Sequence, residues 1–210
     1  MSKYKKTTLI CPCCGKRSEQ DVLIGLSYSN KFMDLDTFPN DDAVYDRTII
    51  CPTCGFSSMS FTLPVSKTVI DTVHSDSYQS FFNDQSIDDK AKKNLLSAYL
   101  LGKQKKYKEA GFGYLTAYWY LRTIDLSSAK KALTKAIKYL ASYVENNTDI
   151  NSAIVLIDAL RQNGQFNEAM DTLDSLSQHL SNGTDFADIL NKEKKLIRSR
   201  NKDPHLISEV

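Results

Sequence analysis

CPCCG at residues 11–15 and CPTCG at residues 51–55 are two copies of one pattern, CPxCG, and they decide the fold of the N-terminal region of this chain. Within each copy, the two-residue gap lets two thiolate sulfurs reach one ion, and a tetrahedral Zn²⁺ binds four such sulfurs at about 2.3 Å. Two paired gaps are far more specific than a single CxxC. The sequence therefore predicts one zinc ion held jointly by both copies, which we call the first and second knuckle.

Five cysteines compete for four ligand positions. Cys14 stands directly before a glycine, as Cys54 does in the second knuckle, so Cys13 is interpreted as a spacer. The predicted ligands are thus Cys11, Cys14, Cys51 and Cys54. A closed shell of four thiolates leaves no open position for water or substrate, which predicts a structural zinc. The alternative role for Cys13 is that of a reactive thiol.

Short stretches rich in Thr and β-branched residues lead into the knuckles, at residues 6–10 and 48–50. Residues 22–26 and 58–63 are the expected returning strands, since polar and apolar side chains alternate in the second of them. These four segments predict a small antiparallel zinc ribbon.

The segment between the knuckles, residues 27–47, is rich in Asn, Asp and Pro and predicts a long loop. Its carboxylates suggest either a solvated acidic loop or a site for a hard cation or acid–base chemistry. Asp34 and Asp36 form an Asp-x-Asp pair without the Gly and distal Glu of a calcium loop. The other members are Asp41, Asp42 and Asp46.

Helical periodicity begins near residue 64 and continues almost to the end of the chain. The predicted helices cover 88–103, 107–124, 127–146, 150–163, 166–180 and 185–200. Asp88 and Asp149 are candidate N-caps, whereas Asn163-Gly164 and Asn182-Gly183 suit helix ends. We expect an α+β fold: a zinc-ribbon domain (1–63), connecting short helices (64–86), a domain of stacked helical hairpins (87–200) and a tail (201–210).

The helix expected at 107–124 carries apolar and aromatic residues on two sides, which predicts a central position in the helical domain. Gly111 and Gly113 lower its helix propensity but allow a neighbouring helix to approach closely. Its aromatic residues are interpreted as core, with a peptide-binding groove as the alternative.

The balance of 27 basic and 25 acidic residues gives a net charge of +2 and does not by itself indicate a polyanionic partner. No apolar run suits a signal peptide or a membrane span. A cytoplasmic location, in which thiols stay reduced, is therefore expected, and it favours metal binding over disulfides.

Two resemblances add to this interpretation. Gly164-Gln165-Phe166-Asn167-Glu168-Ala169, followed by Leu173, resembles the turn and second helix of a tetratricopeptide repeat. Residues 8–80 resemble an uncharacterised bacterial family with two CPxCG knuckles around an Asp-Leu-Asp-x-x-Pro segment, here residues 34–39. In that pattern a basic residue usually precedes the Pro, where this chain has Phe38. The family resemblance implies a fold and a bacterial cytosolic setting, but no mechanism.

Three functions fit the sequence. The first is a protein–protein interaction or scaffold module, which binds a partner protein or a second copy of the chain. The second is a nucleic-acid-associated factor that uses the ribbon and a basic last helix, with Lys192, Lys194, Lys195, Arg198, Arg200 and Lys202. The third is an enzyme that uses the Asp-rich loop or Cys13, although no catalytic triad, phosphate loop or dinucleotide fingerprint supports it.

Overall fold

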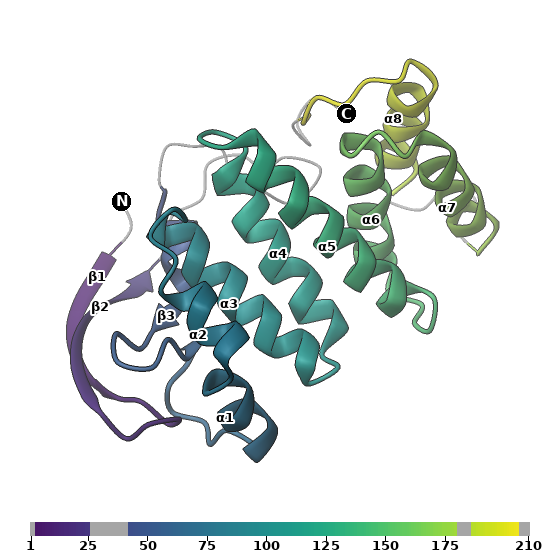
Figure 1. Cartoon of the computed structure of the whole chain (residues 1–210). Helices are drawn as coiled ribbons and strands as arrows, with labels where there is room; N and C mark the ends of the chain where they lie inside the picture. Colours follow the sequence, from purple (N-terminus) through teal and green to yellow (C-terminus); the bar gives the residue numbers. More distant parts are fainter. Residues whose placement is uncertain (1–2, 26–41, 180–185, 206–210) are drawn as a thin grey trace.

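The computed structural model describes residues 3–25, 42–179 and 186–205, and within these segments a pair of strand hairpins precedes eight α-helices (Figure 1). The strands are β1 (Lys3–Ile10), β2 (Arg17–Gly25), β3 (Ile49–Ile50) and β4 (Ser57–Ser58), and a 3-10 helix, η1, covers Asp42–Arg47. The helices are α1 (Lys67–Val73), α2 (Asp76–Phe82), α3 (Asp89–Lys103), α4 (Tyr107–Leu121), α5 (Leu126–Val144), α6 (Ile150–Gln162), α7 (Phe166–His179) and α8 (Ala187–Arg198). The predicted α+β class is confirmed.

Each knuckle forms the turn between two antiparallel strands. The β1–β2 hairpin pairs from Lys3 opposite Gly25 to Ile10 opposite Arg17, and it curves along one side of the molecule (Figure 1). The β3–β4 pair is only two residues long. The described strands therefore form two separate two-stranded sheets, whereas a single ribbon was expected.

The expected strand at residues 58–63 is wrong beyond its first residue. The Ser58 hydroxyl accepts a hydrogen bond from the Ser60 amide at 3.3 Å, and the Ser60 hydroxyl accepts one from the Thr62 amide at 3.2 Å. Such local bonds offer the backbone an alternative to a strand ladder. The alternation of polar and apolar residues here reflects these turns and not a buried sheet face.

The expected loop at 27–47 ends in the 3-10 helix η1, and its candidate residues Asp34, Asp36 and Asp41 lie outside the described residues. The Asp46 carboxylate accepts hydrogen bonds from the Tyr4 hydroxyl at 2.9 Å and the Lys93 ammonium at 2.5 Å. Asp46 therefore joins β1, η1 and α3, which is a structural role.

All six helices expected after residue 87 are present, with ends that differ by a few residues. Asp88 and Asp149 cap α3 and α6 as predicted, since Asp88 accepts hydrogen bonds from the Lys90 and Ala91 amides and Asp149 accepts one from the Ser152 amide. The sequence interpretation missed Asp125, which accepts bonds from the Ser127 and Ser128 amides and starts α5. Asn182-Gly183 lies outside the described residues.

Helices α3 to α8 follow one another in space in chain order, and α4 lies between α3 and α5 (Figure 1). A Cβ at Gly111 would lie 2.6 Å from the Leu140 side chain of α5, and one at Gly113 would lie 2.9 Å from Ala98 of α3. Tyr114 and Trp119 are buried in the main core. The central position of α4 and the core role of its buried aromatics are confirmed.

A second core connects the knuckles to the helices. Cys11, Cys51 and Cys54 share it with Phe56, Phe61, Val69, Val73, Tyr78, Leu96 and Leu100. These residues come from all three predicted segments 1–63, 64–86 and 87–200, and α3 contributes to both cores. The knuckles are therefore packed directly on α1, α2 and α3.

Candidate metal centre

The two knuckles have the same backbone conformation. The Gly15 amide donates to the Cys11 carbonyl at 2.8 Å, and the Gly55 amide donates to the Cys51 carbonyl at 2.9 Å. Both glycines have positive φ, +71° and +76°, a region that side chains with a Cβ rarely adopt. The final Gly of each CPxCG copy is therefore required by the turn that brings its two sulfurs together.

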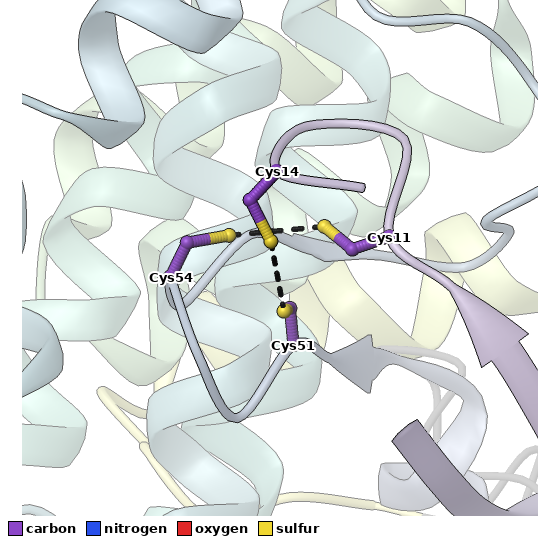
Figure 2. A group of neighbouring side chains, drawn as sticks. All are labelled: Cys11, Cys14, Cys51 and Cys54. Carbon is purple, nitrogen blue, oxygen red and sulfur yellow. Dashed lines mark hydrogen bonds between the residues drawn. The ribbon is translucent and has the colours of Figure 1, made fainter. Parts of the chain in front are cut away.

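The structure brings together the sulfurs of the four predicted ligands, Cys11, Cys14, Cys51 and Cys54, all within 4.8 Å of one another (Figure 2). The Cys11–Cys54 and Cys14–Cys51 sulfur pairs are both separated by 3.7 Å. Four sulfurs at about 2.3 Å from a tetrahedral metal would lie ~3.8 Å apart. A disulfide requires about 2.05 Å, and all five cysteines are free.

Burial makes this cluster unfavourable for thiolates unless a cation is present. It raises the pKa of the Cys11 thiol to about 11 and also raises the pKa of Cys54. Burial acts on Cys51 as well, but the amides of Cys54 and Thr53 and the neighbouring thiols lower its pKa. Metal binding must therefore displace protons from buried thiols, which makes the metal affinity dependent on pH.

Helix α2 supports the second knuckle through contacts that the sequence interpretation missed. The Tyr78 hydroxyl donates to the Gly55 carbonyl at 2.8 Å, and the Gln79 side-chain Nε2 donates to the Cys54 carbonyl at 2.9 Å. The Phe82 ring covers Gly55, where an added Cβ would lie 2.6 Å from it. Apolar periodicity indicated a short helix here, but no local pattern identified its partner.

Cys13 lies outside the group of four, as its position in the CPxCG pattern predicts. Its side chain is half-buried, and burial raises its pKa. A raised pKa reduces the thiolate fraction and with it the nucleophilic reactivity. The position of Cys13 outside the group of four therefore supports its interpretation as a spacer.

A cleft of about 520 Å³ lies beside the second knuckle, between the segment at residues 56–65 and helices α3 and α4. The lining residues are mostly apolar or hydroxylic, with two lysines from the α3–α4 turn and the start of α4: Phe56, Ser57, Ser58, Met59, Ser60, Leu63, Pro64, Val65, Val69, Ser97, Leu100, Leu101, Gln104, Lys106, Lys108, Glu109 and Phe112. The sequence interpretation assigned a possible groove to the aromatics of α4, of which Phe112 lines this cleft.

The cations of the predicted basic helix are distributed over α8 and the segment that follows. Lys194 lies 3.5 Å from Asp174 of α7, and the Arg200 guanidinium lies 4.8 Å from the centre of the Phe166 ring. Lys195 and Arg198 are exposed. Two of these cations, Lys194 and Arg200, therefore contact residues of α7.

Comparison of the chain with protein-family models, curated proteins and solved structures finds no match. The resemblance based on the knuckles therefore stays a prediction. Among the helices of the described segments, none is long and apolar enough to cross a membrane.

Proposed function

We propose that this chain is a cytoplasmic protein-interaction module whose binding cleft is held in shape by a structural zinc ion. The observation that carries the proposal is the position of the cleft: its wall begins at Phe56, two residues after the ligand Cys54. The backbone that shapes this wall is therefore anchored by the metal centre. Helical hairpins stacked in the manner of tetratricopeptide repeats would supply the opposite wall.

Zinc is the metal that best suits the four sulfurs. Tetrahedral sites of four thiolates are typical of zinc or of iron–sulfur centres, and a closed shell of this kind stabilises folding. The two knuckles approach each other closely and leave room for a single ion, since the two closest sulfur pairs are both 3.7 Å apart. Elemental analysis of the purified chain is expected to find one zinc per molecule.

The cleft has the features of a docking surface for protein. Met59 and Leu63 are 59% and 68% exposed and line the same cleft, so two large apolar side chains face solvent within one hollow, as is common at binding sites. The ionisable residues of the lining are Lys106, Lys108 and Glu109, and Lys108 is already paired with Asp149. The cleft therefore supports binding better than acid–base catalysis.

A comparative pull-down tests this function. The zinc-loaded full chain serves as bait beside a Leu63→Asp variant and a Leu126→Asp control, since Leu126 is 76% exposed but does not line the cleft. A true partner should be retained by the wild type and the control, and lost with Leu63→Asp or after zinc chelation. Retention that is unchanged in all four samples would contradict the proposal.

Nucleic-acid binding is the second candidate. It is supported by the exposed cations Lys195, Arg198 and Arg200. A labelled RNA or DNA probe should then bind with an affinity that falls steeply with salt. The combined variant Lys195→Glu, Arg198→Glu should abolish this binding.

A further inference from the structure

We infer that the cleft takes an acidic peptide segment that carries apolar anchor residues. This inference rests on the proposed function and adds the chemistry of the partner. It follows from two features that occur together in the cleft: an apolar surface and lysines from the turn between α3 and α4.

The α3–α4 turn has a strong excess of positive charge. Residues 103–108 read KQKKYK and contain four lysines and no acid. Lys106 lines the cleft, and neither it nor the exposed Lys105 makes an ion pair with any residue the structure describes. Lys108 also lines the cleft, with its ammonium 2.5 Å from Asp149. Glu109 is the single acid of the lining, and when it and Asp149 are set against the four lysines the α3–α4 turn keeps a net charge of +2 (four minus two), which comes from Lys103 and Lys105 beside the cleft.

The backbone at the N-terminus of α4 adds to the positive electrostatic potential of this turn. Lys105 has a φ of 59° and the Lys106 amide donates to the Leu101 carbonyl, so the turn is tight and α4 begins at Tyr107 without a side-chain cap. The first amides of a helix point outward, and the helix dipole makes this end attractive for carboxylates. A carboxylate near Lys106 would therefore gain from both the ammonium and the helix end.

The remainder of the cleft suits aliphatic or aromatic side chains of a peptide. Its volume of about 520 Å³ falls in the range of ~300–1,000 Å³ typical of ligand clefts. Leu63, Val65 and Leu101 supply aliphatic surface, whereas single-stranded nucleic acid binds on exposed aromatic rings. The two aromatic residues of the lining are Phe56, which is buried, and Phe112, which packs partly against the main core. A peptide is thus favoured over a nucleic acid.

The test is a selection of random peptides displayed on phage against the immobilised, zinc-loaded full chain. Selected peptides are then synthesised with a fluorophore, and their binding is measured by anisotropy. We expect enriched sequences to combine Asp or Glu with Leu, Ile or Phe. Lys106→Glu should weaken their binding by about tenfold or more, because a rim charge is reversed. Lys138→Glu, an exposed charge reversal on α5 outside the cleft, should leave the binding unchanged.

The possible outcomes distinguish a failure of the inference alone from a failure of the proposed function. Apolar peptides without acids that bind wild type and Lys106→Glu equally, yet fail with Leu63→Asp, would overturn the inference and leave the proposed function standing. Failure to enrich any peptide, or enrichment of peptides insensitive to Leu63→Asp, would overturn both. Displacement of the peptides by a single-stranded oligonucleotide, with the same dependence on Lys106, would assign the lysine cluster to nucleic acid and overturn the inference.

Discussion

Cys13 and Cys14 are neighbours in the chain, but only Cys14 joins the group of four sulfurs. The reason is the turn: a positive φ at Gly15 and the bond from its amide to the Cys11 carbonyl place the third residue after Cys11 beside it. The second knuckle repeats this geometry with Thr53 in the spacer position. The grouping of these four cysteines was therefore predictable at the residue scale from comparison of two short stretches.

Substitution of single cysteines tests the ligand set. Cys54→Ser should lose the metal and unfold the knuckles, because binding energy on the order of 10 kcal/mol is also folding energy in such sites. Cys13→Ser should keep one zinc per chain. Native mass spectrometry with elemental analysis distinguishes the two variants, and zinc loss in Cys13→Ser would show that the assignment is wrong.

The two knuckle glycines offer a matched pair of substitutions. Gly15→Ala and Gly55→Ala both force a Cβ into a positive φ, which costs about 1–2 kcal/mol. At Gly15 the Cβ would meet nothing within 4 Å, whereas at Gly55 it would overlap the Phe82 ring. We therefore expect Gly55→Ala to be less stable by a further 1–3 kcal/mol, roughly, in urea unfolding of the zinc-loaded chain. Equal destabilisation of the two variants would show that α2 does not cover the second knuckle.

At the scale of elements, the helices were more predictable than the strands. Helical periodicity and a capping Asp are both local signals, so the helices from α3 onward were found to within a few residues. The prediction of a strand at residues 58–63 was wrong because the Ser58 and Ser60 hydroxyls accept hydrogen bonds from nearby backbone amides. In addition, β4 pairs with β3 over only two residues, so there is little sheet for a longer strand to extend. The cleft and the support of the knuckle by α2 depend on contacts between distant segments, which no local pattern contains.

Asp149 interacts with two helices, α6 and α4, and provides a test at the scale of elements. It caps α6 through the Ser152 amide at 3.2 Å and pairs with Lys108 of α4 at 2.5 Å. The hydrogen bond from Lys108 is the main reason that its pKa falls to about 2. Asp149→Ala should cost about 1–2 kcal/mol, and Asp149→Asn, which keeps a capping oxygen, about half of that.

The pH dependence of this contribution has a defined sign. The folded pKa of Asp149 lies below the unfolded value of about 3.9, so its stabilisation is present above pH 4 and is lost as the pH falls toward 2. Urea midpoints of wild type and Asp149→Asn should therefore converge as the pH is lowered through this range. A difference that stays constant would indicate that the Lys108–Asp149 pair contributes little.

At the scale of the whole molecule, the metal centre and the helices cannot be treated as independent. Cys11, Cys51 and Cys54 share a core with α1, α2 and α3, and α3 also packs in the main core with α4. Loss of the metal should therefore loosen α1 to α3 before it affects the far helices. The cleft lies across this junction, since its lining includes Val69 of α1 and Leu100 of α3 from the second core.

The far end of the molecule holds a buried charge network that was not predicted. Arg161 of α6 donates to Asp158 and to Glu193 of α8, and all three side chains are fully buried. Its guanidinium also donates to the carbonyls of Asn201 and Asp203, which fixes the segment after α8. Two carboxylates thus share one cation, and Glu193 Oε1 has no hydrogen-bond partner among the described residues.

We expect protonation of Asp158 to make the stability of the fold dependent on pH. Burial, together with the charge of Glu193, raises the pKa of Asp158 to about 7. Because this folded value lies above the unfolded value of about 3.9, the stabilisation is complete below pH 4 and is lost as the pH rises through 7. Between pH 6 and 8.5 the wild type should therefore lose roughly 1 kcal/mol or more in urea unfolding.

The variant Glu193→Gln isolates the pH dependence that comes from Asp158. The side-chain amide of the substituted residue can donate a hydrogen bond to the Asp158 carboxylate at every pH. This variant should show a nearly flat stability profile over the same pH range, whereas Asp174→Asn, which removes an exposed ion pair between α7 and α8, should keep the wild-type slope. Amide hydrogen exchange in α8 should follow the same pattern. After correction for the intrinsic increase with pH, the exchange rate should rise between pH 6 and 8.5 in the wild type and in Asp174→Asn. It should not rise in Glu193→Gln. A wild-type profile as flat as that of Glu193→Gln would show that Asp158 does not take up a proton in this range.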